Sequence, residues 1–121
     1  MLEKFKSIRP FLGAKNFDIS RNFYWDLGFK EKVLFLNMSL FEMGNLSFYL
    51  QDAYVKDWID NTMIFLEVED VATYYEKIKG LNLTSKYKEV KLVPIKDHPW
   101  GRECYLHDPS GILWHIGTFK K

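Results

Sequence analysis

The sequence predicts an α+β protein made of two copies of a βαβββ unit. Three observations carry this prediction. Each half contains a helical pattern that begins at a capping residue and ends at a glycine, each helical pattern follows one strand-like segment, and each precedes three more. The caps, Asn16 and Asp70, lie 54 positions apart, and the closing glycines, Gly28 and Gly80, lie 52 apart. This near-constant spacing indicates an internal repeat of structural elements.

The first half begins with a strand expected over residues 7–13. Asn16 then serves as an N-cap, because its side chain can accept a hydrogen bond from a free helical N–H. The apolar residues of the helix recur at helical spacing: Ile19, Phe23 and Leu27. Gly28 stands where a left-handed glycine commonly ends a helix. Three strand-like segments follow at 29–35, 38–43 and 46–51, with a hairpin turn at Gly44 and Asn45.

The second half replays this order. Residues 62–69 alternate as a half-buried strand does, and Asp70 caps a helix that ends at Gly80. Its apolar stripe consists of Val71, Tyr74, Tyr75 and Ile78. Three further strands are expected at 89–96, 102–107 and 112–119. The sequence therefore predicts one domain over 1–121, with one unit at about 5–51, a polar linker at 52–61 and a second unit at about 62–119.

The closing hairpin carries the most specific motif. Between its strands lies Asp108-Pro-Ser-Gly111, in which Asp108 can bond the backbone and Gly111 tolerates positive φ. Together with Trp100-Gly-Arg-Glu103, this turn resembles the closing hairpin of the vicinal oxygen chelate superfamily, which contains glyoxalase I, bleomycin-resistance proteins and extradiol dioxygenases. The resemblance covers nearly the whole chain and is closest to the metal-free bleomycin-resistance-like members. It implies an open, cupped half-barrel with helices on its outer face, and a homodimer.

Composition excludes several classes of function. Seventeen basic residues oppose sixteen acidic ones, for a net charge of +1, so the chain lacks the basic footprint of a nucleic-acid-binding protein. No apolar run approaches the length of a membrane span, and the first residues lack a signal-peptide core. Cys104 is the single cysteine and has no partner for an internal disulfide. The cytoplasm is therefore the expected location.

Strand alternation sorts side chains into a helix-facing set and a cup-facing set. In the closing hairpin the buried set is Cys104, Leu106, Trp114 and Ile116, and the cup set is Glu103, Tyr105, Leu113 and His115. In the preceding strand Met63, Phe65 and Glu67 are expected to face the cup, with Ile64, Leu66 and Val68 under the helices. In the first strand Arg9 and Phe11 are expected in the cup, with Ile8 and Leu12 under the helix. Cys104 is accordingly expected to be an inert thiol.

Metal-dependent members of the superfamily hold a divalent ion in the cup, and the resemblance places Arg9, Met63 and His115 at three of the ligand positions. Arginine has no lone pair to donate, and the methionine thioether favours soft metals. We therefore expect no metal and no other cofactor. His98 and His107 flank exposed turns and are assigned no chemistry.

Three functions remain open. The first is a metal-free small-molecule binding protein similar to bleomycin-resistance proteins, although that class is typically acidic and this chain is nearly neutral. A planar ligand would contact Arg9, Phe65, Glu67, Trp100, Glu103, Tyr105 and His115. The second is a glyoxalase-like lyase or isomerase, or a dioxygenase-like enzyme, using His115 with Glu103 or Glu67 for acid–base chemistry. The third is a non-catalytic interaction module whose cup is filled by side chains such as Phe11, Met63, Phe65 and Leu113.

Overall fold

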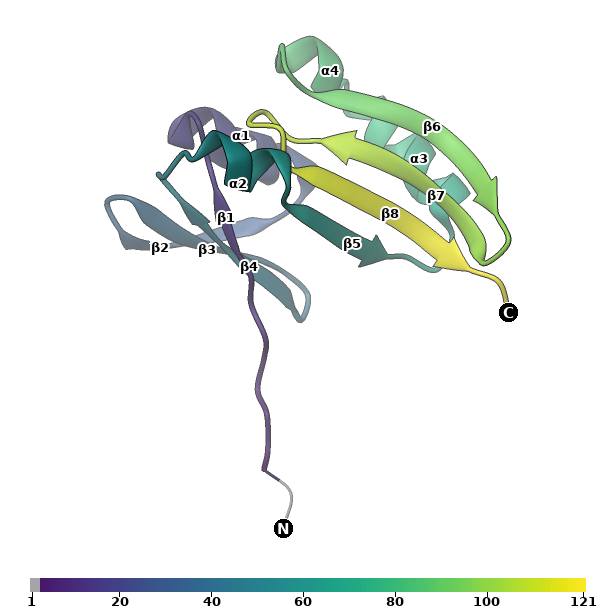
Figure 1. The fold of residues 1–121 in the computed structure, drawn as a ribbon, viewed down its shortest axis with the longest axis horizontal. Coiled ribbons are helices and arrows are strands. Elements are labelled where there is room, and N and C mark those ends of the chain that lie inside the picture. The colour runs from purple at the N-terminus through teal and green to yellow at the C-terminus, as the bar shows by residue number, and fades with distance from the viewer. Residues whose placement is uncertain (1–2) are drawn as a thin grey trace.

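The computed structural model describes residues 3–121 and contains two four-stranded sheets and four helices (Figure 1). The first sheet consists of β1 (Phe11–Gly13), β2 (Lys30–Phe35), β3 (Met38–Met43) and β4 (Leu46–Gln51). The second consists of β5 (Met63–Glu67), β6 (Lys91–His98), β7 (Gly101–His107) and β8 (Leu113–Phe119). The helices are α1 (Phe17–Leu27), α2 (Lys56–Asp60), α3 (Val71–Gly80) and α4 (Leu83–Lys86).

The two sheets share one topology. Their strand orders are β1-β4-β3-β2 and β5-β8-β7-β6, with the first-named pair parallel and the others antiparallel. Neither sheet closes into a barrel. The prediction of an α+β fold with two βαβββ units is therefore confirmed. None of the helices in the described chain is long and apolar enough to cross a membrane.

The main helices begin as their sequences predict. The side chain of Asn16 accepts a hydrogen bond from the N–H of Ile19, at 3.1 Å, and Gly28 ends α1 in the left-handed region with φ of 117°. Asp70 caps α3 by accepting from the N–H groups of Ala72 and Thr73. Gly80, however, is the last helical residue of α3. The left-handed turn comes two residues later, at Asn82 with φ of 56°.

The first strand is shorter than its prediction. It pairs with β4 only from Phe11 to Gly13, and the chain before it extends away from the body (Figure 1). The expectation that Ile8 packs under the first helix was wrong, because its side chain is 96% exposed. Leu12, in contrast, is buried as predicted. Two short helices, α2 and α4, were not predicted.

The two units share one hydrophobic core. Tyr24 of α1 contacts Phe48 of β4 and Trp114 of β8, with ring centroids 4.9 and 5.9 Å apart. The Tyr24 hydroxyl donates to Asp108 at 2.7 Å and accepts from the indole N–H of Trp114 at 3.0 Å. Burial, and then the Asp108 carboxylate, raise the pKa of Tyr24 well above its usual value, so its hydroxyl keeps its proton. This buried network joins the first helix to the closing hairpin.

Candidate functional site

The β5–β8–β7 register collects the predicted cup residues on one face. Phe65 lies beside His115, which lies beside Tyr105, and Glu67 lies beside Gly117, which lies beside Glu103. The opposite face is buried, with Cys104, Leu106, Trp114 and Ile116 in the core. We call the exposed side of this sheet the cup face; it carries Met63, Phe65, Glu67, Glu103, Tyr105, Leu113 and His115.

Gly117 leaves room on this face for its neighbours. A Cβ at this position would lie 3.0 Å from Cζ of Phe65 and 3.3 Å from Cβ of Glu103. Such contacts are tighter than most real Cβ contacts, so any larger residue would displace the phenylalanine ring or the glutamate. The absence of a side chain at Gly117 therefore allows Phe65 and Glu103 to approach one another over the sheet.

A buried carboxylate forms the polar centre of the cup face. The side chain of Glu103 is 7% exposed, and His115 Nδ1 lies 2.9 Å from its Oε1. The hydroxyl of Tyr105 donates to Oε2 at 3.1 Å. Desolvation, and then the hydrogen bond to Glu103, raise the pKa of Tyr105, so this hydroxyl stays protonated as a donor. A charged group this deep requires such partners.

The structure adds His98 to this centre. Its Nε2 lies 2.9 Å from Oε2 of Glu103, in a direction that does not satisfy a hydrogen bond. The contact is an ion pair only when the imidazole is protonated. We predicted no chemistry for His98, and the hairpin register contained the missing signal. A two-residue turn pairs His98 with Gly101, which places His98 on the same face as Glu103.

Aromatic rings surround the carboxylate. The Trp100 ring stacks on the His98 ring at 5.0 Å, with 8° between their planes. The Phe65 ring lies 5.9 Å from that of Trp100, 5.5 Å from that of Phe119 and 6.3 Å from that of His115. The Phe65 and Phe119 side chains remain 43% and 48% exposed. Flat apolar surface is thus open to solvent beside the glutamate.

Arg9 lies apart from this cluster. Its guanidinium donates to Ser47 Oγ and to the hydroxyl of Tyr49, both at 3.0 Å, on the first sheet. Within one chain Arg9 therefore contacts neither Glu103 nor Glu67, although its position in the sequence placed it in the same cup. Glu67 belongs to the cup face by register, and among residues 3–121 it forms no ion pair.

The side chains at the three inferred metal positions do not fit a hard divalent ion. His115 uses Nδ1 for Glu103, and its Nε2 faces the Met63 thioether at 3.4 Å. Arg9 offers only donors. Within residues 3–121 no group of three His, Cys, Asp or Glu side chains is arranged to hold a metal. The chemistry of this face is therefore that of its own side chains.

Cys104 lies on the other face of β7 and is fully buried. Desolvation raises the pKa of its thiol to about 11. At neutral pH the thiol is therefore protonated and a poor nucleophile, as the strand alternation predicted.

Comparison with known proteins identifies the fold. The sequence matches no protein-family model and no curated protein sequence. Among solved structures, the bleomycin-binding protein of Streptomyces verticillus, in complex with copper(II)-bleomycin, has a TM-score of 0.81 at 22% identity, covering 98% of this chain and 100% of that one. An antibiotic-binding protein from a Streptomyces species has a TM-score of 0.74 at 15% identity, covering 98% and 100%.

An enzyme has the same architecture. Lactoylglutathione lyase from Agrobacterium tumefaciens has a TM-score of 0.71 at 18% identity, covering 96% of each chain. The chain therefore has the fold of the vicinal oxygen chelate superfamily, as the closing hairpin indicated. Because binding proteins and an enzyme share this fold, function must be argued from the site.

Proposed function

We propose that this protein binds a planar or aromatic small molecule on its cup face, without a metal ion. The observation that carries the proposal is the Glu103 carboxylate, buried among two imidazoles and a tyrosine hydroxyl. Burying a carboxylate is costly unless it is paired and hydrogen-bonded, and here its partners are two imidazoles and a hydroxyl rather than a guanidinium. A polar group of a ligand would compete for or complete these contacts.

The rings beside Glu103 supply the apolar part of the proposed site. Phe65, Trp100 and Phe119 contact one another edge to face or at a tilt, so the cluster is held in place while part of each phenylalanine stays exposed. Ligand pockets commonly combine such aromatic surface with a few convergent polar groups. The filled-cup alternative is disfavoured because this surface is open.

The solved structures with this fold support a small-molecule ligand without naming it. One of them is a bleomycin-binding protein and another is an antibiotic-binding protein. This chain is nearly neutral, unlike the typically acidic bleomycin-resistance proteins, so we do not propose bleomycin as its ligand. Its single cysteine is buried and free, which suits a reducing compartment, and we propose the cytoplasm as its location.

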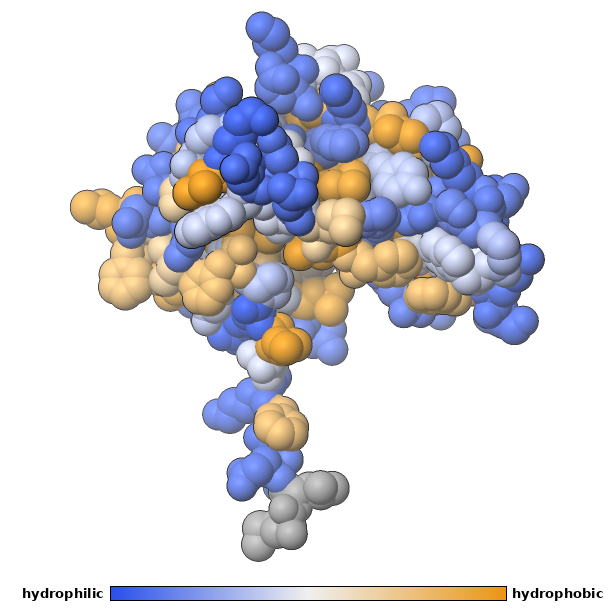
Figure 2. All heavy atoms as spheres, in the orientation of Figure 1, coloured by the Kyte–Doolittle hydropathy of each residue, from blue (hydrophilic) through white to orange (hydrophobic). Residues whose placement is uncertain are grey.

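We further propose that the protein is a homodimer and that the second copy completes the ligand site. Phe5 and Ile8 are 90% and 96% exposed, and Figure 2 shows the N-terminal segment projecting from the body with apolar side chains uncovered. The cup face and the edge of β5 are also uncovered. Sedimentation at micromolar concentration is expected to give twice the 14.5 kDa chain mass; a monomer alone would contradict the dimer.

The ligand proposal is tested by screening planar compounds and measuring affinity for matched tryptophan variants. Trp100→Ala is expected to weaken binding by about tenfold, the scale of one lost stacking contact. Trp58→Ala is the control, because Trp58 lies on α2 and is 73% exposed. His115→Ala should also weaken binding. Unchanged affinity in both Trp100→Ala and His115→Ala would remove the cup face from consideration.

The metal-free part of the proposal has its own test. Elemental analysis of tag-free protein should find no stoichiometric Zn, Ni, Fe or Mn, because Arg9 and Met63 replace ligands that such ions favour. Near one equivalent of any of these would contradict it.

An enzyme is the second candidate, favoured by the 2.9 Å contact between His115 Nδ1 and Glu103. A carboxylate in this position holds an imidazole in a fixed orientation, as the orienting group of a general base does. Catalysis is favoured if the wild-type protein converts its ligand to a product and His115→Gln abolishes that conversion without weakening ligand binding. Product formation unaffected by His115→Gln would exclude this role.

A further inference from the structure

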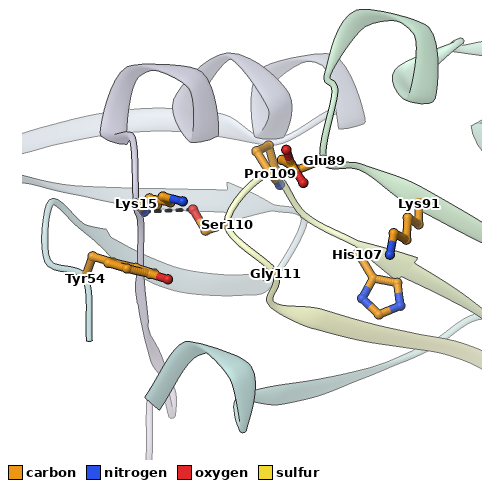
Figure 3. A pocket seen from close by; sticks show the side chains of 8 residues that line it. All are labelled: Lys15, Tyr54, Glu89, Lys91, His107, Pro109, Ser110 and Gly111. Atoms are coloured by element: carbon orange, nitrogen blue, oxygen red, sulfur yellow. Dashed lines mark hydrogen bonds between the residues drawn. The ribbon is translucent and has the colours of Figure 1, made fainter. Parts of the chain in front are cut away.

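A second hollow lies away from the aromatic cluster, where the two units meet (Figure 3). Its volume is about 250 Å³, and its walls are mostly polar. We call it the junction pocket; the residues used below are Lys15, Tyr54, Glu89, Lys91, His107 and Ser110. Because β7 runs from Gly101 to His107, the pocket lies at the opposite end of that strand from Trp100.

The walls of the pocket come from both units and are fixed by hydrogen bonds. The backbone N–H of Lys15, just before α1, donates to Ser110 Oγ at 2.8 Å, as the dashed line in Figure 3 marks. The turn that carries Ser110 is held by Asp108, whose Oδ1 accepts three backbone N–H groups at 2.9 Å each. The pocket is therefore shaped before any ligand enters, which lowers the entropic cost of binding.

Two lysines bring unpaired positive charge to this pocket. In the described chain the lysines with a carboxylate partner are Lys32, Lys56 and Lys86, so Lys15 and Lys91 have none. Lys15 Nζ lies 5.7 Å from the Tyr54 ring, a cation–π contact at one end of the pocket. Figure 3 shows Lys91 beside His107 at the other end.

The surroundings of His107 lower the pKa of its side chain. Desolvation, and then the charge of Lys91, lower the pKa of its imidazole. The imidazole is therefore neutral at pH 7 and leaves the lysines as the cations of the pocket. Glu89 is the single carboxylate on the wall, so the lining carries a net charge of +1 from two lysines and one glutamate.

We propose that the junction pocket binds the oxyanion group, a carboxylate or a phosphate, of a small molecule. Lys15 lies beside the Ser110 hydroxyl at one end of the pocket and Lys91 lies beside His107 at the other, so both lysines attract an anion that enters it. The backbone N–H groups of the 110–112 turn are already used by Asp108, so side chains make the contacts. The proposal is independent of the cup face and of its ligand.

The test follows the His107 ring signals by NMR at fixed pH during titration with sodium phosphate or sodium acetate, against sodium chloride at equal ionic strength. Saturable shifts with phosphate or acetate, and not with chloride, are expected. Tighter binding of phosphate identifies a phosphoryl group as the source, and tighter binding of acetate identifies a carboxylate. Absence of saturation with both anions overturns the proposal.

Charge variants make the test specific. Lys15→Ala and Lys91→Ala should each weaken binding by about threefold, the scale of an exposed ion pair, and Glu89→Gln should strengthen it by a similar factor. Lys77→Ala, on the exposed side of α3, and Trp100→Ala are the controls and should leave the affinity unchanged. If Lys77→Ala weakens binding as much as Lys91→Ala does, the effect is general screening and the proposal fails.

Discussion

Each unit contains a glutamate whose side chain is almost fully buried, and the two glutamates have different partners. Glu31 on β2 is 5% exposed and forms two bonds with the guanidinium of Arg21, at 2.8 and 3.1 Å. Glu103 on β7 is 7% exposed and faces imidazoles that carry charge only when protonated. Arginine is charged at every relevant pH, whereas histidine is not. The first carboxylate thus has a permanent cation as its partner, whereas the partners of the second are imidazoles and a hydroxyl with which a ligand can compete.

The location of the two carboxylates agrees with this difference. Glu31 lies opposite Phe41 of the core and also accepts from Ser39, so its contacts are complete within the fold. Glu103 lies on the open face, beside half-exposed rings. Two units of the same topology therefore use a buried charge differently: the first for structure, and the second, in our proposal, for recognition.

The largest expected change in stability comes from comparing the Asp108 turn of the second unit with the Asn45 turn of the first. Asp108→Ala removes the acceptor of three backbone N–H groups and of the Tyr24 hydroxyl. Because the hydroxyl and the Ile112 N–H are buried, the free energy of unfolding should fall by about 3 kcal/mol or more. Asn45→Ala, in the exposed turn of the first unit, is the control and should change it little. Urea unfolding measures both. A loss below about 1 kcal/mol in Asp108→Ala would contradict the network described here.

The next effect compares the glutamates directly. Glu31→Gln should lower the free energy of unfolding by about 1 to 2 kcal/mol, because the side chain of Glu31 is nearly buried and Arg21 would keep only the exposed Asp18 as its carboxylate partner. Glu103→Gln should change it by less than about 1 kcal/mol, since the amide still accepts hydrogen bonds and the buried charge is removed. Equal losses in the two variants would abolish the distinction between a structural and a responsive carboxylate.

The Glu31 effect should also depend on pH. Burial raises the pKa of Glu31, but the hydrogen bonds from Arg21 and Ser39 outweigh it, so the pKa lies below its usual value. Its stabilisation is therefore complete above the unfolded pKa of about 4.3 and is lost as pH falls through the lower folded pKa. The urea midpoints of the wild type and Glu31→Gln should therefore converge over that acidic range, and their difference should stay constant between about pH 6 and 8.

A smaller effect compares the two helix caps. Asn16→Ala should cost about 1 kcal/mol at every pH, because an amide does not titrate. The bond from the Thr73 hydroxyl lowers the pKa of Asp70, so the contribution of that cap is lost as pH falls through its folded pKa. Thermal unfolding should show a lower Tm for Asp70→Ala than for the wild type at neutral pH, and this difference in Tm should shrink at acidic pH. A pH-dependent loss in Asn16→Ala would contradict the assignment.

The smallest effect concerns Cys104. Because burial raises the pKa of the thiol to about 11, a thiol reagent at neutral pH should leave the folded protein unmodified and react fully once urea unfolds it. Mass spectrometry of the labelled chain measures this. Rapid labelling under native conditions would show that the closing hairpin opens.

Sequence reasoning succeeded where the signal was local. The caps at Asn16 and Asp70, the left-handed Gly28 and the Asp108 turn each depend on bonds between residues a few positions apart. Alternation likewise separated the buried and exposed faces of β7 and β8, because those strands pair over their full length.

It failed where the outcome depended on distant partners. Alternation assigned a face to Ile8 but could not show that β4 pairs only with Phe11 to Gly13. The helices α2 and α4 contain five and four residues, too few for a periodic pattern. Predicting the contact between His98 and Glu103 would have needed the strand register across the turn before β7. Predicting the partners of Arg9 would have needed the position of the first sheet relative to the second.

The bonds from Tyr24 have a consequence for how the chain folds. They reach Asp108 and Trp114, 84 and 90 positions along the sequence, so they form only after most of the chain has been brought together. Contacts between such distant positions slow folding, because loop-closure entropy opposes them until the native core assembles. Either half alone would leave buried polar groups without partners. The internal repeat is thus expected to unfold in one cooperative transition, and neither half is an independent folding unit.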